Sequence, residues 1–300
     1  KWRTAAPPAR SQSIREIPGF LSFTAVFVII WLREQTFALV SLALLGLGTA
    51  LTGYFPAEIG FYCTTFLMSV GFHYYETMNQ SLALQWLPKA TAPRQLGQIM
   101  QAGAFATIAA YGIVWVCNKV LGFDYIPIYV IGGGLTVAIA AALWLAFPRF
   151  KEVVPQRKEL ILRKRYWLYY ALQFMSGARR QMFVVFAGFR MVEKFGYAVH
   201  EITSLYLITL LANMVSAPLV GRAVGVFGER SALVFEYIGL AVIFFLYGGL
   251  YYFGWGVVLA ASLYVVNHIF FSLALALKTY FQKIADPADI APTAAVAFTI

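Results

Sequence analysis

Apolar segments of membrane-spanning length follow one another along the whole chain, separated by short polar turns. A helix that crosses the hydrocarbon core of a bilayer needs about 20 mostly apolar residues. Hydrophobic residues make up 61% of the chain and charged residues 12%, whereas a soluble globular protein carries about 25% charged residues. A chain of 300 residues cannot hide this excess of apolar surface in a core, so its solvent has to be lipid. The predicted fold class is therefore all-α, a polytopic transmembrane helical bundle.

The expected membrane helices are separated by turns rich in glycine, proline or charge. In chain order they cover residues 18–32, 37–54, 59–87, 97–120, 125–147, 166–186, 202–220, 232–253 and 256–281, with a further helix that begins near Ile290. The short segment 18–32 is either a re-entrant or interfacial helix or a spanning helix, and we favour the spanning helix. A basic linker, 148–165, divides the chain into an N-terminal half, 1–147, and a C-terminal half, 166–300. We expect a longer parent protein, with helices missing at both ends.

Basic residues gather on one predicted side of the membrane. Seven of the 23 lysine and arginine residues lie between Arg149 and Arg165, within the linker. Cytoplasmic loops carry an excess of Lys and Arg, so the linker is predicted to be cytoplasmic and the protein to lie in a bacterial inner (plasma) membrane. The net charge of +10 then predicts contact with anionic membrane lipids and no nucleic-acid partner. Both cysteines, Cys63 and Cys117, lie in apolar segments, which excludes a disulfide framework.

Two short motifs recur at nearly the same offset in the two halves. Ser-Leu-Ala-Leu occurs at 81–84 and again at 272–275, and Ala-Leu-Val occurs at 38–40 and again at 232–234. Each Ala-Leu-Val follows a charged turn at a predicted helix start. The pattern indicates two pseudo-repeated halves, an arrangement in which transporters build their substrate site between the halves.

Two loop motifs resemble those of the major facilitator superfamily (MFS) of secondary transporters. The turn 87–97, with its two prolines, resembles the family's turn between helices four and five. Residues 221–230 are similar to its Gly-x-x-x-Asp-Arg-x-Gly-Arg-Arg loop between helices eight and nine; Gly221, Gly228 and Arg230 match, while Gly225 stands in place of the Asp. The resemblance implies an MFS-like bundle, here helices two to eleven, and a gating loop that contains the three matching residues.

Polar side chains occur in the middle of three predicted membrane helices. An ionisable group at this depth costs about 2.5–3.5 kcal/mol on insertion scales, which makes it a candidate functional residue. The three clusters are His73, Tyr75, Glu76 and Gln80 on one helix; Arg179 and Arg180 on another; and Asn267 and His268 on a third. The MFS resemblance implies that these helices, four, seven and ten, line the central cavity.

The charges of these clusters suggest how a proton and a substrate are coupled. A carboxylate in a low-dielectric site holds a proton until a nearby arginine stabilises its ionised form. Glu76 is therefore the predicted proton-coupling group, with His73 and His268 as proton relays. An arginine released from Glu76 offers a planar fork for an anion. The predicted substrate-binding residues are Arg179, Arg180, Asn267, Gln80 and Tyr75.

The sequence thus predicts a secondary active transporter that moves a small organic solute by alternating access, coupled to protons and with an anionic substrate. The alternatives are a multidrug or cation efflux carrier, an uncoupled facilitator, and a receptor or enzyme on a transporter-like scaffold. The sequence has no metal-ligand spacing, phosphate-binding loop or nucleophile elbow. We therefore expect no enzyme activity, no cofactor and no metal, and a protein that works as a monomer with a small-molecule substrate.

Overall fold

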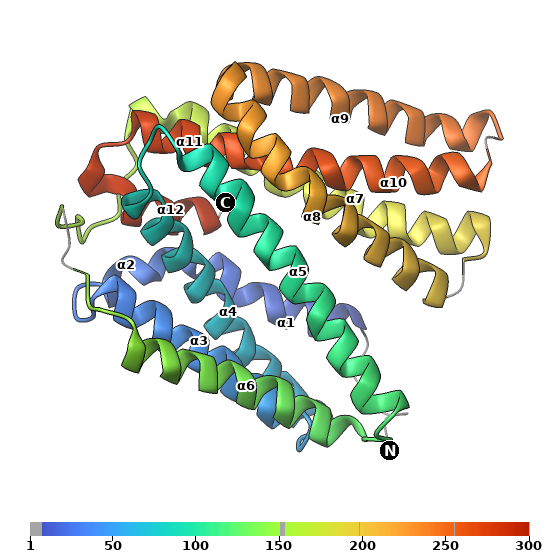
Figure 1. Cartoon of the computed structure of the whole chain (residues 1–300), viewed down its shortest axis with the longest axis horizontal. Coiled ribbons are helices and arrows are strands. Elements are labelled where there is room, and N and C mark those ends of the chain that lie inside the picture. The colour runs from blue at the N-terminus through green and yellow to red at the C-terminus, as the bar shows by residue number, and fades with distance from the viewer. Residues whose placement is uncertain (1–7, 151–153, 198, 255, 300) are drawn as a thin grey trace. The chain divides into compact units, whose positions relative to one another are not determined.

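The computed structural model describes residues 8–150, 154–197, 199–254 and 256–299, and within these ranges it contains helices and no strand (Figure 1). Six helical segments of the described chain are long and apolar enough to cross a membrane; they are Glu34–Thr52, Ala92–Lys119, Tyr125–Ala146, Glu201–Phe227, Glu229–Leu250 and Val257–Ile284. The all-α membrane fold class is confirmed.

The chain forms two compact units that interleave along the sequence. Unit 1 consists of Lys1–Trp86, Ile113–Lys164 and Ala285–Ile300; unit 2 consists of Leu87–Gly112 and Arg165–Ile284. The two units are defined by which residues contact one another in the structure. The predicted division into two halves at the linker 148–165 concerns a repeat in the sequence, and it stays a prediction.

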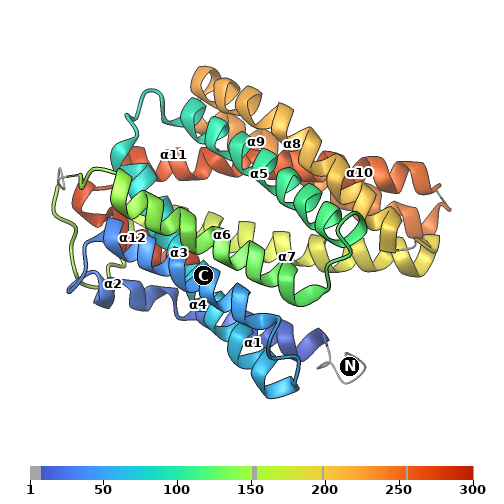
Figure 2. The ribbon, with the colours of Figure 1, turned by 60° about the horizontal axis from the view of Figure 1, so that its bottom comes forward.

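Unit 1 is built around α3, which packs against α4 and α6 (Figure 2). Its helices are α1 (Pro8–Phe20), α2 (Ala25–Val28), α3 (Glu34–Thr52), α4 (Glu58–Trp86), α6 (Tyr125–Ala146) and α12 (Ile290–Thr299). A Cβ atom on Gly133 of α6 would lie 2.3 Å from the carbonyl oxygen of Gly46 on α3. Only glycine permits this approach, so small residues hold the two helices together where lipid provides no hydrophobic driving force.

The predicted membrane helix 18–32 is wrong as a single element. Helix α1 begins earlier, at Pro8, and ends at Phe20; a 3-10 turn at Ser22–Thr24 then separates it from the four-residue α2. The Ser22 hydroxyl donates to the carbonyl of Pro18, and the Thr24 hydroxyl donates to the carbonyl of Leu21 at 2.6 Å. Hydroxyl groups that bond to the nearby backbone compete with regular helix geometry. The number of apolar residues in a segment does not reveal such a break.

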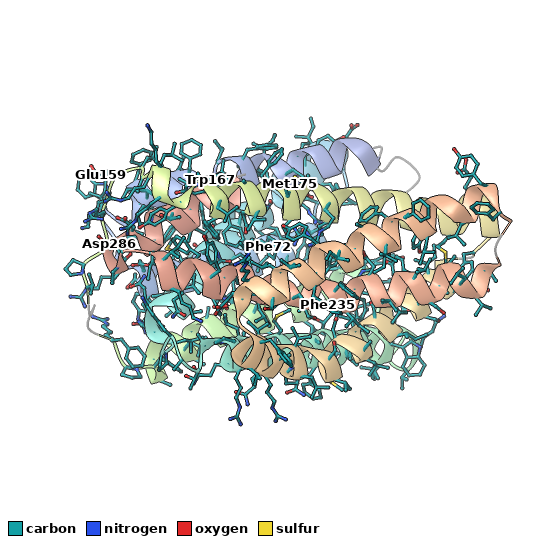
Figure 3. The ribbon with its side chains drawn as sticks, turned by 90° about the horizontal axis from the view of Figure 1, so that it is seen from above. Phe72, Glu159, Trp167, Met175, Phe235 and Asp286 are labelled. Atoms are coloured by element: carbon teal, nitrogen blue, oxygen red, sulfur yellow. The ribbon has the colours of Figure 1, made fainter. Side chains whose placement is uncertain are left out.

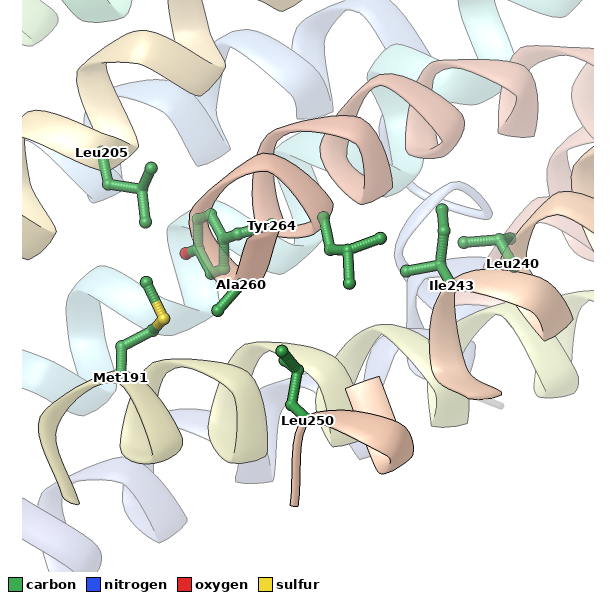
Figure 4. Packing of buried hydrophobic residues seen from close by; sticks show 8 residues of the cluster. Met191, Leu205, Leu240, Ile243, Leu250, Ala260 and Tyr264 are labelled. Carbon is green, nitrogen blue, oxygen red and sulfur yellow. The ribbon is translucent and has the colours of Figure 1, made fainter. Parts of the chain in front are cut away.

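Unit 2 contains four long helices together with α11 and the first part of α5. Their bounds are α5 (Ala92–Lys119), α7 (Trp167–Phe195), α8 (Val199–Phe227), α9 (Glu229–Tyr252), α10 (Val257–Phe271) and α11 (Leu275–Ile284). An apolar cluster joins α7 to α10 and includes Met191, Leu240 and Tyr264 (Figure 4). The side chains of Trp167 and Met175 on α7 and of Phe235 on α9, labelled in Figure 3, are exposed, as expected of a lipid-facing surface.

The predicted loop between α8 and α9 is almost entirely helical. Helix α8 continues to Phe227 and α9 begins at Glu229, so Gly228 alone separates them, with φ at +81°. Glycine adopts this backbone conformation without the steric cost that a Cβ brings, so the chain changes direction within one residue. Gly221 lies inside α8, where an added Cβ would come within 2.5 Å of the Pro93 carbonyl oxygen on α5.

The basic linker is bonded to the turn that precedes α12, within unit 1. The Gln156 side chain donates to the Pro287 carbonyl at 2.8 Å and accepts from the backbone N–H of Ala291 at 2.9 Å. Arg157 and Arg163 both bind the carboxylate of Asp289, which is fully buried; the Arg163 Nε to Asp289 Oδ2 distance is 2.5 Å.

The hydrogen bond to Asp289 raises the pKa of Arg157 above its ordinary value, so this arginine stays charged. Two of the seven basic residues of the linker therefore bind a buried carboxylate, and the predicted contact with anionic lipids stays a prediction.

Candidate functional site

An ion pair lies buried in unit 2, between α7 and α9. Arg179 Nη2 is 3.1 Å from Glu236 Oε1, and the side chains are 11% and 3% exposed. The adjacent Arg180 is exposed, since neighbours on a helix point about 100° apart. Of the two arginines predicted to bind substrate, one is therefore buried in unit 2 and the other lies on its surface.

The Arg179 guanidinium is only partly satisfied. Nη2 also donates to the Ser176 hydroxyl at 3.2 Å, but Nε and Nη1 are buried and have no hydrogen-bond partner in the described parts of the chain. Aromatic rings lie beside the group: its central carbon is 4.9 Å from the ring centre of Phe271 and 6.0 Å from that of Tyr237. A buried donor without a partner costs about 1–3 kcal/mol, and more when it is charged. The two free N–H groups therefore mark a place for an acceptor.

Asn267 of α10 is a second buried polar group without a partner. Its side chain is 0% exposed, and neither its amide nitrogen nor its amide oxygen has a hydrogen-bond partner among the described residues. It lies four residues before Phe271, so the two side chains share one face of the helix. That face carries the ring that contacts Arg179. An unpaired buried amide calls for an explanation, and a ligand between α7 and α10 would provide one.

His268 follows Asn267 and is half-buried. Its Nδ1 is 2.8 Å from the carbonyl oxygen of Tyr264, and its ring centre is 5.4 Å from that of Phe271. A carbonyl oxygen only accepts, so Nδ1 carries a proton. His268 therefore lies next to Phe271, the ring that also contacts the Arg179 guanidinium.

The polar cluster on α4 belongs to unit 1. The His73 ring packs against Gly19 of α1: a Cβ atom added to Gly19 would lie 3.0 Å from that ring. Glu76 is half-buried, and within the described ranges it makes no hydrogen bond or ion pair; Tyr75 is half-buried and Gln80 is buried. The predicted pairing of Glu76 with an arginine stays a prediction.

Sequence analysis missed Glu236 as the partner of Arg179. The available signal was an acidic residue inside the predicted membrane segment 232–253, which by the cost of burying a charge points to function. The pattern of apolar residues predicts the helix that carries this acid. It does not predict which other helix the acidic side chain contacts. Only the tertiary structure, in which the Arg179 guanidinium of α7 meets this carboxylate of α9, identifies the cation that it binds.

Helices α3 and α9, which contain the recurring Ala-Leu-Val motif, each begin with a buried acid that is bonded to another helix of its own unit. Glu34 of α3 accepts from the Ser81 hydroxyl at 2.7 Å and from the Gln85 amide at 2.9 Å. Glu229 of α9 accepts through Oε2 from the Lys283 ammonium at 2.8 Å. Both acids come shortly before the repeated Ala-Leu-Val motif, whereas Arg230, predicted to act in gating, is exposed.

The comparisons with known proteins identify the fold. No family model matches the chain, and no curated protein is similar to it in sequence. Among solved structures, it is similar to the crystal structure of an MFS transporter, FucP, in the outward conformation, with a TM-score of 0.68 and 13% sequence identity over 99% of this chain and 81% of that chain. Together with the helices of membrane-spanning length, this similarity shows an integral membrane protein with the fold of the major facilitator superfamily transporters.

Proposed function

We propose that the protein is a secondary active transporter that moves a small organic anion across a bacterial inner membrane by alternating access, coupled to protons. The observation that carries the proposal is the buried Arg179 guanidinium, with two N–H groups that have no partner among the described residues. The MFS fold supports transport as the activity, and the arginine supports the charge of the substrate. An enzyme or a receptor on the same scaffold has no comparable support.

The chemistry of the guanidinium favours an anion over a cation. It is planar, always charged and matched to the two oxygens of a carboxylate or phosphate. In a water-poor site such charge-assisted hydrogen bonds are about twice as strong as neutral ones. A cation at the same place would meet the positive charge in a medium of low dielectric constant, which opposes the efflux of lipophilic cations.

The predicted roles of the other residues complete the proposal. Arg179 holds the anion, with Asn267, Gln80, Tyr75 and Arg180 as further binding residues. Glu76, His73 and His268 are the predicted proton-coupling groups. Gly221, Gly228 and Arg230 are the predicted gating residues, and the linker 148–165 faces the cytoplasm.

Replacement of Arg179 by lysine tests the proposal. Arg179→Lys keeps a cation beside Glu236 but loses the planar fork. We expect its uptake of the preferred anion to fall about tenfold to a hundredfold, because a hydrogen bond to a charged group is worth about 1.5–3 kcal/mol. The measurement is uptake of radiolabelled L-lactate, propionate, succinate and phosphate into proteoliposomes under an inward acid gradient. Arg222→Lys, at an exposed arginine of α8, is the matched control.

The same assay distinguishes the alternatives. Uptake that ignores the acid gradient indicates a facilitator. Transport of tetraphenylphosphonium in place of the four anions indicates a cation carrier, and equal anion uptake by Arg179→Lys and wild type removes Arg179 from the site.

A further inference from the structure

Glu236 is a buried carboxylate whose one ion pair among the described residues is with Arg179. Its side chain is 3% exposed. Removing a carboxylate from water costs several kcal/mol unless a cation or good hydrogen bonds compensate it. Whenever Arg179 binds something else, Glu236 therefore has to be neutralised in another way.

The geometry of Arg179 makes a ligand and Glu236 competitors. A guanidinium binds an oxyanion side-on through one of two edges, and both edges include Nη2. Glu236 and Ser176 already occupy Nη2, at 3.1 and 3.2 Å, while Nε and Nη1 are free of partners in the described chain. An anion that binds side-on displaces one of them from Nη2. An anion that binds Nε or Nη1 alone shares the single positive charge with Glu236.

Either arrangement places two negative charges next to one positive charge in a site with little water. Two carboxylates that share such a site cannot both stay ionised. Among the described residues, the one cation that pairs with Glu236 is Arg179. Other ionisable groups on α9 and on the helices that contact it include Tyr237, which follows Glu236; His268 on α10, with one nitrogen bonded to a carbonyl; Lys283 on α11, paired with Glu229; and the exposed Arg222 on α8. A proton from water on the Glu236 carboxylate restores the balance of charge.

We propose that Glu236 is the proton-exchanging partner of Arg179, and that the substrate is a small monocarboxylate with a hydroxyl or amide group that Asn267 binds. The carboxylate of the substrate takes the place of Glu236 on Arg179, and Glu236 takes up one proton. The Asn267 amide, both a donor and an acceptor without a partner in the described residues, bonds the polar group of the substrate. The inference rests on the proposed function and deepens it.

The test is the pH dependence of anion binding to the purified full chain in detergent, measured by calorimetry with L-lactate. One proton taken up per anion makes the affinity fall about tenfold per unit rise in pH, over the range in which the empty site is ionised and the complex is protonated. We expect this slope for wild type and its loss in Glu236→Gln. Glu229→Gln, which removes another buried, ion-paired carboxylate from the same helix, should keep the wild-type slope.

A second pair of ligands tests Asn267. L-Lactate and propionate differ by one hydroxyl group, so wild type should prefer L-lactate and Asn267→Leu should bind the two equally. Size-exclusion chromatography and thermal unfolding check that each variant is folded. If Glu236→Gln does not fold, Glu236→Asp is used in its place. In Glu236→Asp, the pH range over which the anion affinity falls should differ from that of wild type.

The outcomes separate this inference from the proposed function. The role of Glu236 is overturned if the anion affinity of Glu236→Gln depends on pH as it does in wild type. It is also overturned if the affinity of Glu236→Asp falls over the same pH range as in wild type. If the slope is instead lost in Glu76→Gln, the proton site is in unit 1 and the proposed function stands. Saturable binding of neither probe by wild type overturns the monocarboxylate assignment, and failure of all four anions in the uptake assay removes the proposed function as well.

Discussion

The acids at the starts of α3 in unit 1 and α9 in unit 2 are held by different kinds of partner. In unit 1, Glu34 accepts from the neutral Ser81 and Gln85. In unit 2, Glu229 pairs with Lys283 and Glu236 with Arg179. Helices α3 and α9, which share the Ala-Leu-Val motif, thus both begin with a buried acid, but the two acids bind different partners. A carboxylate held by neutral donors loses a hydrogen bond when a partner is removed, whereas one held by a cation is left as an uncompensated buried charge.

The largest effect is expected at the deepest ion pair of unit 2. Arg179→Leu should lower the free energy of unfolding by about 3–5 kcal/mol, because Glu236 is then buried without a cation. Titration of the purified protein with sodium dodecyl sulfate in mixed micelles measures the loss. The double variant Arg179→Leu, Glu236→Leu should recover most of it, since no charge remains to be compensated. Losses that simply add would mean that the two side chains do not stabilise each other.

A smaller effect is expected at the one ion-paired acid of the described part of unit 1 that is fully buried, Asp289. Asp289→Asn should cost about 1.5–3 kcal/mol, the value of a hydrogen bond to a charged group, because Arg157 and Arg163 are partly exposed and regain water. Asp286→Asn is the control: its carboxylate is more exposed and lies 3.4 Å from Arg157, so it should change stability by less than about 1 kcal/mol. Thermal unfolding of both variants measures the difference, and equal losses would contradict it.

The smallest change in the free energy of unfolding is expected when a partner of Glu34 or Glu229, the acids at the starts of α3 and α9, is removed. Lys283→Met and Gln85→Leu should each cost about 1 kcal/mol, the first being limited by the half-exposed lysine. Their response to salt should differ. Raising the ionic strength to about 1 M shortens the Debye length to about 3 Å, so it should reduce the cost of Lys283→Met and leave that of Gln85→Leu unchanged. The same salt response in both variants would show that the two acids are held alike.

The sequence predicted one part of the candidate site and missed another. Arg179 and Asn267 stand out because polar groups are costly inside apolar segments, and the structure buries both in unit 2. Arg180 has the same sequence signal but is exposed, since membrane depth does not specify which way a side chain points. Glu236 was not recognised as a partner because its cation lies 57 residues away in the sequence, on another helix.

The sequence by itself determined the solvent, the helical class and the approximate membrane segments, because the length and polarity of an apolar run have to match the bilayer whatever the helix packs against. Only the tertiary structure decided where helices break and which charges meet. The interruption after Phe20 and the single-residue turn at Gly228 depend on local hydrogen bonds and backbone angles. The pairs Arg179–Glu236 and Arg163–Asp289 join segments distant in the chain, and helical periodicity defines a face without naming the group that lies opposite it.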